Sequence, residues 1–95
     1  MPTEKDEPYG SLEFTRTFLE TLCGRAFNAA ERRQFLSALD RLDTDERHPS
    51  LRVHQLRGDL AGLWSASASR SLRLTFERLD GGRKRLIAYS RHYGD

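Results

Sequence analysis

The chain has 95 residues, enough for one domain with a small hydrophobic core, and its sixteen Lys and Arg against fourteen Asp and Glu give a net charge of +2. The single cysteine, Cys23, excludes an intrachain disulfide and any zinc site that needs several cysteines. This cysteine usage fits a reducing compartment, so we expect a cytoplasmic protein. No apolar run approaches the roughly 18 residues of a membrane span, so we expect no membrane partner.

The charge is unevenly distributed. Residues 1–46 carry six basic against ten acidic side chains, a net charge of −4, whereas residues 47–95 carry ten against four, a net charge of +6. Fourteen of the sixteen basic residues are arginine, whose planar guanidinium suits phosphate. The asymmetry is typical of a nucleic-acid partner for the second half, although solvated surface charge would produce it too.

The predicted elements begin with residues 1–10, which are polar, contain Pro2, Pro8 and Gly10, and are expected to form a disordered lead. Residues 11–95 are expected to form one domain. Residues 11–15 are compatible with a short first strand.

Two amphipathic helices should follow. The first is predicted from an apolar pattern that ends at Gly24, and it should bury the Cys23 thiol. The second should begin with a capping box of Asn28 and Glu31 and end near Thr44, before Pro49. We expect helices of about 8 and 16 residues packed as a hairpin. Their apolar positions are Phe18, Leu19, Leu22 and Cys23, then Phe35, Leu36, Leu39 and Leu42.

After Pro49 the pattern changes to a period of two, which predicts strands at 51–56, 63–69, 71–79 and 83–93. Asp80-Gly81-Gly82 is a strong hairpin signal between the last two strands. The residues expected to face the helices are Leu72, Leu74, Phe76, Ile87 and Tyr89. The fold class is therefore α+β: an N-terminal helical hairpin packed on one face of a four-stranded, or five-stranded, mainly antiparallel sheet.

The same alternation places Arg73 and His92 on the outer face, with Tyr93 within reach. An imidazole, a fixed cation and a phenol are what RNA cleavage through the 2′-hydroxyl requires for proton transfer, charge stabilisation and substrate orientation. The alternative for each is an exposed, solvated side chain. His54 lies beside Arg52 and Arg57 and is the better candidate for the substrate face.

Other chemistry-bearing residues have simpler interpretations. We expect His48 to be structural or solvated. Trp64 is expected to be a core or sheet-packing residue, with base stacking as the alternative. Three scattered histidines do not form a zinc pattern, so no metal or other cofactor is expected.

Several short motifs, taken in order, resemble one family. They are His54-x-Leu56-x-Gly58, the sequence Gly-Leu-Trp-Ser at 62–65, Arg73-Leu74 and the terminal His92-Tyr93, all after two amphipathic helices. This order and spacing resembles the RelE/YoeB branch of the RelE/ParE toxin superfamily.

The resemblance implies a RelE-like fold and the toxin of a type II toxin–antitoxin pair, which enters the ribosomal A site and cuts messenger RNA without a metal. Its partners would be the mRNA and a cognate antitoxin. It implies that Arg73 stabilises the transition state, that His92 is the general acid and that Tyr93 orients the substrate. The RNA-binding candidates are Arg52, Arg57 and Arg91.

Two positions depart from the family pattern. Ser50 stands where YoeB-like toxins carry a glutamate base, so we expect His54 to be the base. Ala66 stands where those toxins carry a basic residue. The alternatives are a ParE-like inhibitor of DNA gyrase, a degenerate member that only binds its antitoxin, and a generic RNA-binding module.

Overall fold

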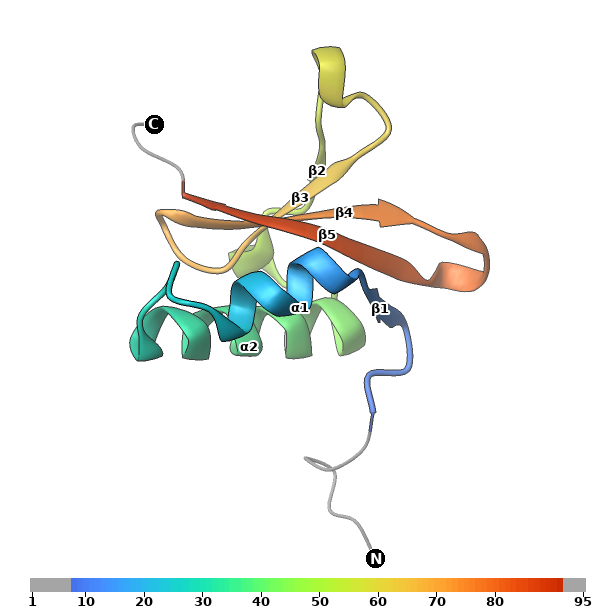
Figure 1. The fold of residues 1–95 in the computed structure, drawn as a ribbon. Helices are drawn as coiled ribbons and strands as arrows, with labels where there is room; N and C mark the ends of the chain where they lie inside the picture. The colour runs from blue at the N-terminus through green and yellow to red at the C-terminus, as the bar shows by residue number, and fades with distance from the viewer. Residues whose placement is uncertain (1–7, 92–95) are drawn as a thin grey trace, which may run out of the picture.

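The computed structural model describes residues 8–91, which form two helices and one five-stranded sheet (Figure 1). The elements in chain order are β1 (Leu12–Phe14), α1 (Arg16–Cys23), α2 (Ala29–Thr44), β2 (His54–Gln55), β3 (Trp64–Ser67), β4 (Leu72–Arg78) and β5 (Lys84–Arg91). The strand order is β1-β5-β4-β3-β2. No helix within residues 8–91 is long and apolar enough to cross a membrane.

Both helices lie on one face of this sheet, as predicted for an α+β domain (Figure 1). The first strand exists and makes the sheet five-stranded: β1 pairs with β5 in parallel, and the other three pairings are antiparallel. Gly81 and Gly82 of the predicted hairpin have φ values of 74° and 77°. Glycine adopts this left-handed region without a steric penalty, which explains why the turn joins β4 to β5 here.

The two helices have the predicted lengths of 8 and 16 residues. The Thr15 side chain accepts a hydrogen bond from the amide of Phe18 at the start of α1. At the start of α2, the Asn28 side chain accepts from the Glu31 amide at 2.8 Å, and the Glu31 carboxylate accepts from the Asn28 amide at 3.0 Å. The predicted capping box is therefore confirmed, and it satisfies amides that the helix itself leaves unpaired.

The packed structure begins before residue 11, at Tyr9. Its ring lies edge-on to Phe14, and its hydroxyl donates to Asp40 at 2.9 Å. Burial and the Asp40 carboxylate raise the pKa of Tyr9 to about 12. Of the predicted lead, residues 1–7 lie outside the described residues.

An aromatic cluster fills the space between the helices and β5. Tyr89 stacks on Phe18 with 3.9 Å between ring centroids, and it meets Phe35 and Phe27 edge-on at 4.5 and 5.6 Å. The Tyr89 hydroxyl has no hydrogen-bond partner among the described residues, and burial raises its pKa. Tyr89 thus faces the helices, as strand alternation predicted.

Each helix buries a narrower stripe than its sequence suggested. Phe18 and Phe35 are fully buried, whereas their neighbours Leu19 and Leu36 are 45% and 43% exposed. Consecutive residues are 100° apart around a helix, and helices covering a sheet on one side leave their other side to solvent. The prediction that Cys23 is buried was also wrong, since its thiol is exposed at the end of α1.

A β-bulge in β5 overturns the prediction that Ile87 lies in the core. Thr75 pairs with Ala88 but Phe76 pairs with Leu86, so β5 contains one extra residue at this point. Such an insertion reverses the alternation beyond it. Leu86 is fully buried in place of Ile87, which is half-buried.

The predicted strand 51–56 is shortened to His54–Gln55. Pro49–Leu51 instead forms a 3-10 turn with the Leu51 side chain fully buried. Arg52 then adopts the left-handed conformation, with φ 47° and ψ 46°, and extended pairing resumes only after it. This irregular connection borders the hollows described next.

Candidate functional site

A cleft of about 1040 Å³ lies where the end of α2, the 3-10 turn at Pro49–Leu51 and the β3–β4 turn meet. We call it the arginine cleft. Its charged lining residues are Arg41, Arg52, Arg70 and Arg73, and no acidic residue among residues 8–91 lines it. Four guanidinium groups without a lining carboxylate form a site suited to a phosphate-bearing ligand.

Arg73 is anchored at one wall of this cleft. Its Nη1 donates to the carbonyls of Ser69 at 2.6 Å and Leu72 at 3.1 Å, which ties the guanidinium to its own hairpin turn. Its neighbours on β4, Leu72 and Leu74, are fully buried against the helices, so Arg73 lies on the outer face as predicted. A preorganised cation of this kind needs little rearrangement when charge develops beside it.

Three side chains form a hydrogen-bonded chain that begins at this cleft, which Arg41 and Ser50 line. Arg41 Nη1 donates to Ser50 Oγ at 3.1 Å, and Ser50 Oγ lies 2.7 Å from His48 Nδ1. The Ser50 amide also donates to this nitrogen at 3.2 Å, so His48 caps the 3-10 turn. His48 was predicted to be structural or solvated, and the sequence did not connect it with Ser50. The sequence held one signal for this contact. His48 directly precedes Pro49-Ser50, and the residue before a proline that begins a turn often caps it with its side chain.

His54 lies in a different hollow from Arg73. Its Nδ1 is 2.8 Å from the Arg52 carbonyl, and its exposed ring lines a shallow hollow beside Arg57. The strand register pairs His54 with Ser65 and Arg73 with Ser67. Both side chains therefore lie on the outer face, at positions two residues apart along β3. The structure therefore brings Arg52 and Arg73 into one cleft, but neither His54 nor Arg57 lines it.

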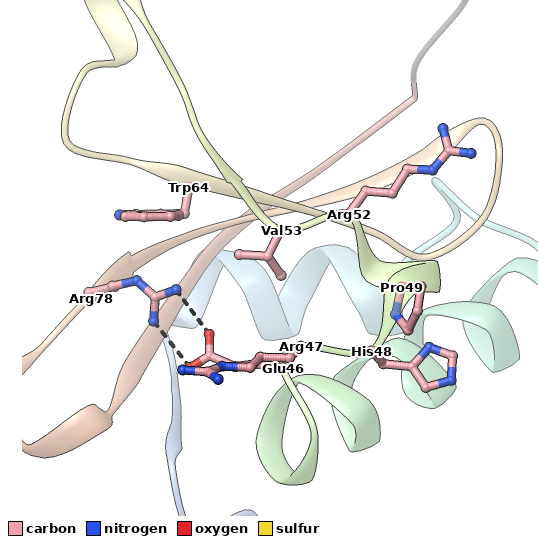
Figure 2. Close-up of a pocket in the computed structure, with 8 residues that line it drawn as sticks. All are labelled: Glu46, Arg47, His48, Pro49, Arg52, Val53, Trp64 and Arg78. Atoms are coloured by element: carbon pink, nitrogen blue, oxygen red, sulfur yellow. Dashed lines mark hydrogen bonds and ion pairs between the residues drawn. The ribbon is translucent and has the colours of Figure 1, made fainter.

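A second hollow, of about 480 Å³, adjoins the arginine cleft and shares Pro49 and Arg52 with it. Figure 2 shows Trp64, Arg78 and Glu46 on one side of this Trp64 hollow, with Arg52 extending away from them. The Arg78 guanidinium lies 4.3 Å from the Trp64 ring centroid and 2.9 Å from a Glu46 carboxylate oxygen. Trp64 thus packs on the sheet beneath an arginine.

The carboxylate of Glu46 is held in its charged form. The hydrogen bond from Arg78 is the main cause, and it keeps the pKa of Glu46 below its ordinary value although partial burial opposes this. Nearby Lys84 and Arg47 act in the same direction.

Arg91, an RNA-binding candidate, lies on the helix side of the sheet. Its Nη2 donates to Glu31 Oε1 at 3.0 Å and to the Ala26 carbonyl at 3.0 Å, and its guanidinium lies over the Phe27 ring. Any RNA contact by Arg91 would compete with this ion pair. The other two terminal candidates, His92 and Tyr93, lie outside the described residues.

Within residues 8–91, no three His, Cys, Asp or Glu side chains gather closely enough to hold a metal ion.

Comparisons with known proteins give structural matches alone, since no protein-family model and no curated protein matches the sequence. The YoeB/ParE toxin from Agrobacterium tumefaciens is 18% identical, with a TM-score of 0.67, and the match covers 87% of this chain and 99% of that one. The YoeB-YefM complex from Staphylococcus aureus is 17% identical, with a TM-score of 0.65 and coverages of 86% and 95%. The toxin–antitoxin complex RelBE2 from Mycobacterium tuberculosis is 21% identical, with a TM-score of 0.58 and coverages of 86% and 96%. The chain therefore has a RelE/YoeB-like toxin fold, as its motifs predicted.

Proposed function

We propose that this protein is the toxin of a type II toxin–antitoxin pair and acts as a metal-independent endoribonuclease on messenger RNA at the ribosome. In this proposal it works in the cytoplasm and is neutralised by a cognate antitoxin. Matched structures described as toxin–antitoxin complexes, YoeB-YefM from Staphylococcus aureus and RelBE2 from Mycobacterium tuberculosis, support that partner.

The observation that carries the proposal is the arginine cleft. A single RNA strand presents one negative charge per nucleotide, and arginine contacts to phosphates supply most of the affinity in such interfaces. Arg73 lies in this cleft with one nitrogen fixed to backbone carbonyls and is suited to the charge that builds on a phosphate during cleavage.

The reaction requires a base for the 2′-hydroxyl and an acid for the leaving 5′-oxygen. The resemblance assigns the acid to His92 and substrate orientation to Tyr93. It leaves the base unassigned, because Ser50 stands where a glutamate is expected. His54 was the candidate from the sequence.

A direct test is controlled expression of the wild-type chain and of Arg73→Ala in a bacterial host, followed by growth measurement and mapping of mRNA 5′ ends. We expect the wild type to arrest growth and to cut mRNA, and we expect Arg73→Ala to lower cleavage by about 100-fold. The matched control is Arg83→Ala, because Arg83 is an exposed arginine paired with Glu13 that lines none of the three hollows. Undiminished cleavage by Arg73→Ala would contradict the proposal, as would growth arrest without new 5′ ends.

The alternative is a toxin that inhibits DNA gyrase without nuclease chemistry, in which Arg73 would have no catalytic role. Nη1 of Arg73 is already occupied by the carbonyls of Ser69 and Leu72, as expected of an arginine that only stabilises its hairpin. A gyrase supercoiling assay on the same preparations separates the two. Inhibition of supercoiling with intact mRNA would support this alternative.

A further inference from the structure

The hydrogen-bonded chain from Arg41 through Ser50 to His48 includes a hydroxyl that lines the arginine cleft, that of Ser50. Next to this hydroxyl lies a proton acceptor, His48 Nδ1. Ser50 lines that cleft, whereas His48 lines the adjoining Trp64 hollow. The pair therefore connects the two hollows over a distance of 2.7 Å between Ser50 Oγ and His48 Nδ1.

We propose that Ser50 and His48 together supply the missing base: Ser50 contacts the RNA 2′-hydroxyl and passes its proton to His48. This inference rests on the proposed ribonuclease function and assigns a residue pair to one step of it. It replaces His54 in that role.

The hydrogen-bond directions fit this relay. A serine hydroxyl has one proton to donate and two lone pairs to accept with. Arg41 occupies one lone pair from 3.1 Å, and the Ser50 proton points to His48 Nδ1, which leaves the second lone pair for the 2′-hydroxyl. The Ser50 amide shares the single lone pair of His48 Nδ1 with the hydroxyl, so the neutral ring carries its proton on Nε2. Proton transfer to Nδ1 therefore breaks the hydrogen bond from the amide.

The step balances without a cofactor. The 2′-hydroxyl proton moves to Ser50 Oγ while the Ser50 proton moves to His48 Nδ1. The 2′-oxygen forms a bond to phosphorus and the bond from phosphorus to the 5′-oxygen breaks. The leaving oxygen takes a proton from the general acid, which the resemblance assigns to His92. The products are a 2′,3′-cyclic phosphate and a 5′-hydroxyl, and His48 returns its proton to solvent.

The alternatives nearby are less well placed. Glu46 lines the Trp64 hollow with His48, but Arg78 binds its carboxylate at 2.9 Å and lowers its pKa, which weakens it as a base. His54 Nδ1 faces the Arg52 carbonyl, and His54 does not line the arginine cleft. The charged groups around His48 are Arg41, which reaches it through Ser50, and the residues that line the Trp64 hollow with it, Glu46, Arg47, Arg52 and Arg78.

A purely structural role for His48, as the cap of the 3-10 turn, must be separated from proton transfer. His48→Asn does this, because asparagine is a good cap that accepts the same amide hydrogen bond but does not titrate. Ser50→Ala removes the hydroxyl of an exposed side chain, and Ser50→Thr restores a hydroxyl. His54→Gln is the matched control on the other histidine.

The measurement is the single-turnover rate of mRNA cleavage on programmed ribosomes between about pH 5.5 and 8.5, with thermal melts to verify folding. We expect the wild-type rate to rise with pH, because the base must be unprotonated to accept the proton of the 2′-hydroxyl. His48→Asn and Ser50→Ala should lose about 100-fold in rate at pH 7, and His48→Asn should also lose the rising limb. Ser50→Thr should recover most of the rate, and His54→Gln should behave as wild type.

The outcomes distinguish the two proposals. If the wild type cleaves and His48→Asn retains its rate and its rising limb, the relay is wrong while the ribonuclease function stands. Wild-type rates in Ser50→Ala would have the same meaning. If the wild type arrests growth but leaves ribosome-bound mRNA intact, the ribonuclease function and the relay both fail.

Discussion

Two groups of arginines in this protein have opposite surroundings. In the first group each arginine pairs with a carboxylate. Arg78 contacts Glu46 at 2.9 Å and Arg83 contacts Glu13 at 2.6 Å. Arg85 contacts Glu77 at 2.8 Å, and Arg91 contacts Glu31. The arginines of the cleft, by contrast, have no acidic side chain among the described residues that line it. The same residue type therefore serves two purposes, and only its neighbours distinguish them.

This difference corrects the interpretation of the +6 charge on residues 47–95. Much of it is balanced by carboxylates from the acidic first half, such as Glu13, Glu31 and Glu46. Exposed ion pairs contribute little stability individually, but they cancel the field that a partner would feel. Like charges gathered around a cleft repel one another, and an anionic partner would relieve that repulsion. The arginine cleft therefore keeps a cluster of positive charge that no lining carboxylate among the described residues balances.

The largest expected effect comes from neutralising exposed arginines of the cleft. Arg52→Gln with Arg70→Gln should weaken binding of a single-stranded RNA oligonucleotide by about 10- to 100-fold and reduce the slope of log K against log salt by about 1.4, since each lost phosphate contact removes about 0.7. Fluorescence anisotropy between about 50 and 200 mM salt measures both.

The matched control for this experiment is Arg83→Gln with Arg85→Gln, which removes the same charge from arginines that pair with Glu13 and Glu77. We expect its salt slope to be that of the wild type. Equal losses in the two double variants would mean that net charge alone governs RNA binding and that the cleft has no special role.

Local patterns made most of the fold predictable. The helix lengths came from caps and spacing, which act within a few residues, and the β4–β5 hairpin came from the two glycines at 81–82. The errors arose where tertiary packing decides the outcome. The bulge that buries Leu86 in place of Ile87 depends on how β5 pairs with β4, and helical spacing alone does not reveal which of Leu19 and Phe18 faces the sheet.

The candidate site was less predictable because its parts come from separate segments. Arg73 was indicated by strand alternation and by the family resemblance. Arg41 and Arg70 were not singled out, since nothing in their local sequence connects a helix end with a β3–β4 turn. His48 was missed as a functional candidate because its relation to Ser50 depends on the turn that Pro49 begins.

A smaller effect is expected at Arg52, where the cleft places an arginine in a strained conformation. Its φ of 47° is the one positive value among the described non-glycine residues. This conformation costs an L-residue about 1–2 kcal/mol, whereas glycine adopts it without steric cost but loses more chain entropy on folding. Arg52→Gly should therefore raise the free energy of unfolding by up to about 1 kcal/mol while weakening RNA binding.

Urea unfolding of Arg52→Gly beside Arg57→Gly tests this, because Arg57 has an extended φ of −121° where glycine gives no relief. We expect Arg57→Gly to be neutral or destabilising. If Arg52→Gly is stabilising and Arg57→Gly is not, the left-handed conformation of Arg52 lowers the stability of the wild-type protein. Destabilisation by Arg52→Gly would show that the guanidinium contributes more to the fold than its conformation costs.

The smallest expected effect is the pH dependence of one ion pair. The hydrogen bond from Arg91 lowers the pKa of Glu31 from its ordinary value near 4.5 to about 2. A lowered pKa in the folded state stabilises the protein above pH 4.5, and that contribution is lost as pH falls from about 4.5 to about 2.

Glu31→Gln keeps the capping box, since glutamine also serves at this position, but removes the ion pair. It should melt slightly below the wild type at pH 7, and the difference should disappear near pH 2. Glu20→Gln, an exposed change on α1 that removes the same charge, should show no such convergence. If the melting temperatures of Glu31→Gln and the wild type still differed near pH 2, the stabilisation by Glu31 would come from the helix cap and not from the ion pair with Arg91.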